Sequence, residues 1–215
     1  ESPSPIVVIL PGTGAFCSSS IVVALAQLFY DNGYSVLTIS DVFNWQFSES
    51  AASVLTPGYT KVDSADMYNA LCKIFAQLNI KYKDRFTKHI LVGYSLGALH
   101  TLYIADLISE SKGDDKLTFD RYVALNPPAN LIYTVKKIDS YYKVGDSLTE
   151  KQLVNIITKG VSLFKKVMNG SIKPTAKIDI DQADARYLIG LSFHITLTEL
   201  IYSIEMREKQ ACIKA

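Results

Sequence analysis

The stretch HILVGYSLGALHTLYIAD, residues 89–106, joins a run of apolar strand-forming residues directly to a helical pattern. Its centre, GYSLG at 93–97, is a Gly-x-Ser-x-Gly motif at that junction. A turn of this kind lifts the serine hydroxyl above the carboxyl edge of a sheet. Side chains at Gly93 or Gly97 would collide with a neighbouring strand or helix. Ser95 is a nucleophile only if the chain also supplies a base and N–H groups for an oxyanion.

The segments around this motif alternate in the same way between strand and helix patterns. Apolar runs predict strands at 6–10, 34–40, 89–94 and 121–125, and amphipathic spacing predicts helices at 20–31, 63–78 and 96–109. Strands that are apolar throughout need helices on both faces of a parallel sheet. We therefore expect an α/β fold with a mostly parallel sheet.

The pattern changes after Asn130. Residues 132–144, 148–168 and 184–210 have helical spacing, and only KIDID at 177–181 alternates, weakly. We expect a core over residues 1–130 and a helical cap over residues 131–215. A length of 215 residues, 48% of them hydrophobic and 20% charged, fits this organisation.

Composition narrows the possible partners. The net charge of +1 offers no surplus to hold a polyanion, so nucleic acid is not an expected partner. The cysteines Cys17, Cys72 and Cys212 form no CxxC or Cys/His cluster, which argues against a disulfide framework or a zinc site. We expect neither a metal nor an organic cofactor.

No transmembrane segment is expected. The very apolar piece at 187–198 lacks charge for only about a dozen residues, fewer than a spanning helix needs. A soluble chain follows from this. The sequence starts at Glu1 rather than Met, which leaves export after removal of a leader open.

The loop after the first strand, LPGTGAF at 10–16, and the segment LNPPAN at 125–130 extend the motif into a wider resemblance. Residues 6–130 resemble the α/β-hydrolase superfamily, with PGTGA where that superfamily usually has HGxxG. The resemblance implies an incomplete α/β-hydrolase core. More narrowly, residues 11–47 look like a group of poorly characterised bacterial α/β-hydrolases with a helical cap.

The resemblance also implies roles for individual residues. Gly93, Tyr94 and Gly97 would form the nucleophile elbow around Ser95. The backbone N–H groups of Thr13 and Leu96 would hold the oxyanion.

A dinucleotide-binding loop is the competing interpretation of GTGAFC at 12–17, with Asp41 at the position of a ribose-binding acid. Cys17 occupies the third glycine position, where it would crowd the helix against the strand. The pair Tyr133 and Lys137 imitates a reductase motif at a spacing that chance also supplies. A Rossmann-type reductase remains a distant alternative.

The three histidines leave the base open. His89 lies six residues before Ser95 on the same strand, about 20 Å away at the usual rise, so it cannot serve. His100 follows in the helix after the elbow and fits a core position. His194 is the one histidine after the elbow in the chain order Ser, acid, His, but its apolar helical run equally fits a packed cap histidine.

The catalytic acid is also open. The acidic residues that lie closest before His194 are Asp179, Asp181 and Asp184. The chain between them and His194 is too short for the strand and helix that usually separate the acid from the histidine. The resemblance implies a return to the sheet after the cap, bearing acid and histidine. We expect both to lie beyond Ala215; a non-catalytic hydrolase fold would have the same sequence pattern.

Two further features fit an acyl substrate. The cap carries lysines beside apolar residues, which suits either a lipid surface or a solvated helix face: Lys136, Lys137, Lys143, Lys165 and Lys166. Phe43, Trp45 and Phe47 fit either an acyl pocket or simple packing.

The sequence predicts a serine hydrolase that cleaves a carboxylic ester or thioester, or a lipid, through an acyl-enzyme on Ser95. The alternative is an inactive scaffold that binds lipid or a partner in the same cleft.

Overall fold

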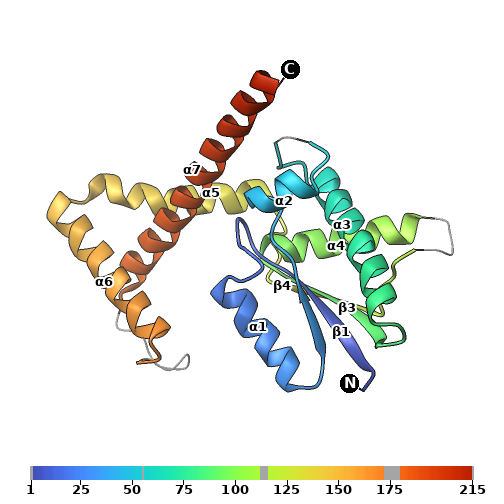
Figure 1. The fold of residues 1–215 in the computed structure, drawn as a ribbon. Helices are drawn as coiled ribbons and strands as arrows, with labels where there is room; N and C mark the ends of the chain where they lie inside the picture. The colour runs from blue at the N-terminus through green and yellow to red at the C-terminus, as the bar shows by residue number, and fades with distance from the viewer. Residues whose placement is uncertain (1, 55, 112–115, 172–179, 215) are drawn as a thin grey trace. The chain divides into compact units, whose positions relative to one another are not determined.

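The structure is a computed structural model that describes residues 2–54, 56–111, 116–171 and 180–214 (Figure 1). The chain divides into two compact units, one of residues 1–129 and 200–215 and one of residues 130–199.

The first unit is built on a parallel sheet. Its strands are β1 (Ser4–Leu10), β2 (Ser35–Thr38), β3 (Phe86–Tyr94) and β4 (Arg121–Leu125), in the order β2-β1-β3-β4. All three strand pairs are parallel. The predicted α/β fold is therefore confirmed. β3 begins three residues earlier than its apolar run, because parallel pairing extends to Phe86 opposite Ser4.

Helices cover both faces of this sheet (Figure 1). Alternate residues of β1 point to opposite faces, as in any strand. Ile6, Val8 and Leu10 pack with side chains of α3 (Thr60–Lys81) and α4 (Leu96–Glu110). Val7 and Ile9 pack on the other face with α1 (Ser20–Asp31). The central strand is thus apolar throughout because neither face meets water.

A short helix, α2 (Trp45–Ser50), lies within the segment that the sequence predicts as a loop. It starts at Asn44, whose side chain accepts a hydrogen bond from the Gln46 N–H. Six residues are too few for a periodic apolar pattern to show, so this helix was missed.

The second unit is helical, as predicted. It contains α5 (Leu131–Tyr142), the 3-10 helix η1 (Lys143–Ser147), α6 (Glu150–Met168) and the first part of α7 (Gln182–Lys214). A reciprocal cap between Thr149 and Gln152 starts α6. Residues 177–179 of the weakly alternating KIDID segment lie outside the described residues.

One described helix is long and apolar enough to cross a membrane by length and composition. It spans Gln182–Met206 with a mean hydropathy of 1.3. The length of this apolar segment was underestimated from the uncharged run at 187–198, because the helix extends well beyond that run on both sides. Long core helices have the same composition, so this property alone assigns no membrane span.

Candidate active site

Ser95 lies on a sharp turn between β3 and α4. Its φ of 53° places a non-glycine residue in the left-handed region, and its N–H donates to the Leu125 carbonyl of β4 at 3.0 Å. A Cβ at Gly93 would meet the backbone of Gly97, and a Cβ at Gly97 would meet the carbonyls of Leu10 and Pro11. The predicted steric reason for both glycines is confirmed.

The glycine loop after β1 lies against this serine. A Cβ built on Gly12 would be 3.2 Å from the Cβ and 3.5 Å from the Oγ of Ser95, and 3.1 Å from the Tyr94 ring. Gly14 has a φ of 70°, which a glycine adopts at no steric cost. β1 and β3 are adjacent while β2 lies on the far side of β1, so this contact is at the switch point of the sheet.

Two backbone N–H groups flank this contact, because Thr13 follows Gly12 in the loop and Leu96 follows Ser95 in the turn. Within the described part of the chain, neither Thr13 nor Leu96 donates its N–H to another residue. Leu96 is the first residue of α4, whose N-terminus carries a partial positive charge. Ser95 is half-buried, and no side-chain hydrogen bond from its hydroxyl caps α4. Two free N–H groups of this kind can donate hydrogen bonds to a substrate carbonyl oxygen and stabilise it as it becomes an oxyanion.

Asp41, in the segment between β2 and α2, binds this glycine loop. Its Oδ2 accepts the Gly14 N–H at 2.7 Å and the Phe43 N–H at 3.3 Å. Burial raises the pKa of Asp41 to about 7, against backbone hydrogen bonds that lower it. From the sequence, Asp41 is predicted only as a ribose ligand in the dinucleotide-binding alternative. The available signal is an acid directly after the strand predicted at 34–40.

Neither histidine of the first unit is placed as a base. His100 is 1% exposed, and its Nδ1 is 2.8 Å from the Ser64 hydroxyl. Burial lowers the pKa of His100 to about 4, which makes it a neutral core residue. The His89 ring packs edge-on against Phe75 with centroids 4.8 Å apart, near the start of β3 rather than its end.

His194 belongs to the second unit. Its ring stacks on the Tyr142 ring at 4.1 Å between centroids, with the planes 8° apart. Tyr142 also stacks on Tyr187, at 6.3 Å. The histidine therefore has a packing role within the helices, and its part in chemistry at Ser95 stays a prediction.

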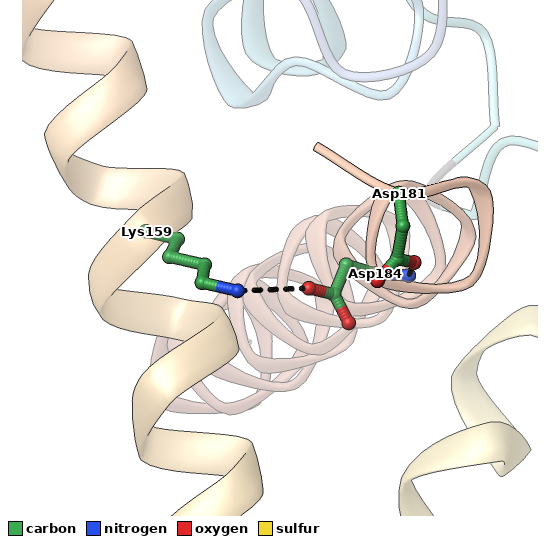
Figure 2. Close-up of polar contacts among 3 residues, drawn as sticks. All are labelled: Lys159, Asp181 and Asp184. Carbon is green, nitrogen blue, oxygen red and sulfur yellow. Dashed lines mark hydrogen bonds and ion pairs between the residues drawn. The ribbon is translucent and has the colours of Figure 1, made fainter. Parts of the chain in front are cut away.

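Two of the three candidate acids make contacts within the second unit (Figure 2). Asp181 Oδ1 accepts the Asp184 N–H at 2.8 Å and so caps the start of α7. The Asp184 carboxylate forms an ion pair of 3.6 Å with Lys159 of α6. In Figure 2 the Lys159 side chain points toward this carboxylate. Asp179 lies outside the described residues.

The aromatic segment after β2 is divided between core and surface. Phe47 is buried and Phe43 packs partly against the same core, whereas Trp45 is 47% exposed. A hollow of about 740 Å³ in the first unit runs along β2, and Ser95 is not among its lining residues. Among the described residues no group of His, Cys, Asp or Glu is arranged to hold a metal ion.

The strand order separates the fold from the dinucleotide-binding alternative. In that fold the third strand lies beside the second, whereas here β3 pairs with β1. Cys17, at the third glycine position, donates its N–H to the Ser40 hydroxyl at 3.1 Å. Tyr133 of the Tyr133 and Lys137 pair is 64% exposed on α5.

Two solved structures are similar to the chain. One is an esterase from Pyrococcus furiosus, at 19% identity and a TM-score of 0.42, covering 69% of this chain and 49% of that protein. The other is the siderophore hydrolase EstB from Aspergillus fumigatus, at 15% identity and a TM-score of 0.42, covering 84% of this chain and 50% of that protein. The chain thus spans about half the length of each. It matches no protein-family model and no curated protein. Its parallel sheet and its strained serine at the switch point give it an α/β-hydrolase-like fold.

Proposed function

We propose that the protein is a serine hydrolase that cleaves carboxylic esters or thioesters through an acyl-enzyme on Ser95. The observation that carries this proposal is the strained turn at Ser95 and its close contact with Gly12 of the glycine loop. The N–H groups of the residues that follow each of them, Thr13 and Leu96, have no acceptor among the described residues. A backbone strained at one polar residue is a common feature of catalytic sites. The reaction places an alkoxide-like oxygen where those N–H groups can hold it.

The two histidines of the first unit do not supply the base for Ser95. His89 and His100 are both held in packing positions that do not serve Ser95. His194 is the remaining candidate within this chain, as the histidine that follows the elbow in the order Ser, acid, His. The scaffold alternative predicts the same fold without any such base.

The substrate class follows from the second unit. The apolar residues Val161, Phe164 and Val167 of α6 are all exposed, and Lys165 and Lys166 lie among them in its last turns. A face of this composition suits an acyl chain or the surface of a lipid. We therefore propose an acyl ester or lipid as substrate, with transient contact to a membrane surface through this face.

Hydrolysis of p-nitrophenyl esters by the full-length protein tests the activity. We expect a burst of p-nitrophenol from the wild type, because acylation precedes hydrolysis of the acyl-enzyme. Ser95→Ala should lower the rate by a factor of about 10³ or more. Ser109→Ala is the matched control, since Ser109 lies at the far end of α4 and its hydroxyl donates to the Asp106 carbonyl. Equal rates for wild type and Ser95→Ala would leave the scaffold as the function.

A further inference from the structure

The glycine loop beside Ser95, residues 12–17, is held by hydrogen bonds to the segment that follows β2. The Asp41 carboxylate accepts the Gly14 N–H at 2.7 Å, and the Asp41 N–H donates to the Ala15 carbonyl at 3.0 Å. The preceding residue, Ser40, accepts the Cys17 N–H on its hydroxyl at 3.1 Å. Two neighbouring residues thus fix the course of the loop just after Thr13.

Thr13 lies between two anchored neighbours. Gly12 is pressed against Ser95, and Gly14 is held by Asp41. A loop with two glycines would otherwise sample many backbone conformations, because glycine lacks the steric limits of other residues. The direction of the Thr13 N–H therefore depends on the bond at Gly14.

We propose that Asp41 is a positioning residue for the oxyanion-binding loop, whose carboxylate holds Gly14 and thereby aims the Thr13 N–H at the oxygen that forms beside Ser95. This inference rests on the proposed function. Asp41 acts on the site through its hydrogen bonds to Gly14 and Ala15. An oriented donor costs no reorganisation during the reaction, which is the source of its effect.

The surroundings of Asp41 make this anchor sensitive to pH. The residue is fully buried, and its Oδ1 has no hydrogen-bond partner among the described residues. The charge of Asp63 in α3 adds a smaller contribution that raises its pKa, and the charge of Asp41 in turn acts on Tyr94 in β3. Burial is the main cause of a pKa of about 7. The Gly14 bond is charge-assisted only in the ionised form, so the anchor weakens as pH falls through this value.

The Gly14 amide reports on the anchor directly, without any activity. We expect its proton resonance in the wild-type protein to move with pH around a midpoint near 7, the pKa of Asp41. The movement should be absent in Asp41→Asn. It should persist in Asp66→Asn, because Asp66 is a buried carboxylate that holds Ser53 instead.

The rate of labelling by a fluorophosphonate at pH 8 then reports on positioning at Ser95. Asp41→Ala should label at least about tenfold more slowly, as expected for a misplaced catalytic donor. Asp41→Asn should stay within about threefold of the wild type, because its amide oxygen still accepts the Gly14 N–H. Asp66→Ala should also stay within about threefold, since it removes a buried carboxylate of similar setting. Circular dichroism verifies that each variant is folded.

The outcomes separate the two proposals. A wild type that labels while Asp41→Ala labels as fast as Asp66→Ala overturns the positioning role alone. A Gly14 amide that does not titrate overturns the pH dependence of the anchor. A full-length wild type that does not label at all refutes the proposed function, and the positioning role falls with it.

Discussion

The two units of the molecule bury their apolar side chains to very different extents. In the first unit, the central strand and its flanking helices form two buried clusters on opposite faces of the sheet. Among the described residues of the second unit, Ile156 and Tyr187 are the buried hydrophobic side chains, and much of the apolar face of α6 is exposed. The first unit therefore has the packing to hold a site rigidly. The second unit instead leaves much of its apolar surface exposed.

The glycines provide the largest test of this difference. Gly97→Ala places a Cβ against the backbone of Leu10 and Pro11, which cannot move without displacing β1. We expect it to lower the free energy of unfolding by about 3 kcal/mol or more. The matched variant is Gly160→Ala in α6, where the atoms nearest to the new Cβ belong to the flexible end of the Leu188 side chain. It should change the free energy by less than about 1 kcal/mol, because helix propensity offsets the contact. Urea unfolding measures both, and equal effects would contradict the comparison.

Truncation of an apolar side chain sharpens the same contrast. Leu71 of α3 is 0% exposed, and Leu71→Ala should destabilise the protein by about 2–5 kcal/mol. Phe164 of α6 is 63% exposed, so Phe164→Ala should cost less than about 0.5 kcal/mol. A cost for Phe164→Ala as large as that for Leu71→Ala would show that the α6 face is packed in solution.

Buried titratable groups of the first unit should make its stability depend on pH in two opposing ways. The pKa of Asp41 rises from 3.8 to about 7, so the folded state binds this proton more tightly and stability falls as pH rises through that window. The pKa of His100 falls from 6.5 to about 4, so stability falls as pH drops through that window.

Single variants separate these two contributions. Between pH 4.5 and 6.5, Asp41→Asn should give a free energy of unfolding that rises more steeply with pH than that of the wild type. His100→Gln should shift the slope in the opposite direction. Unfolding in urea at several pH values measures the slopes; unchanged slopes in both variants would mean that neither group is buried as described.

The smallest expected effect concerns the exposed face of α6. Phe164→Ser should reduce binding to anionic phospholipid vesicles by about threefold to tenfold, because one apolar side chain no longer enters the lipid. Ile80→Ser is the control, since Ile80 is 84% exposed on α3 of the first unit. Co-sedimentation measures both. Equal loss, or no loss, would favour the solvated helix face.

The first unit was predictable because its signals are local. Apolar runs and periodic helices predicted each strand and long helix, and the steric demands of Gly93 and Gly97 follow from any strand–turn–helix junction. The anchor at Asp41 was not predictable, because it depends on β2 lying beside β1 and bringing residues 27 positions apart into contact.

The second unit was predictable only in its helical content. Helical spacing predicted α5, α6 and α7, but periodicity does not tell which ring packs on which. The stacking of His194 on Tyr142 and the ion pair between Lys159 and Asp184 both join separate helices, so the chemical use of His194 and Asp184 could not be judged from spacing.

The most direct test of the account is where a fluorophosphonate probe attaches to the full-length protein. Digestion and mass spectrometry should find the adduct on the peptide that contains Ser95, and Ser95→Ala should remain unmodified. An unmodified wild-type protein, or an adduct on a different serine, would contradict the claim that the strained turn presents a nucleophile.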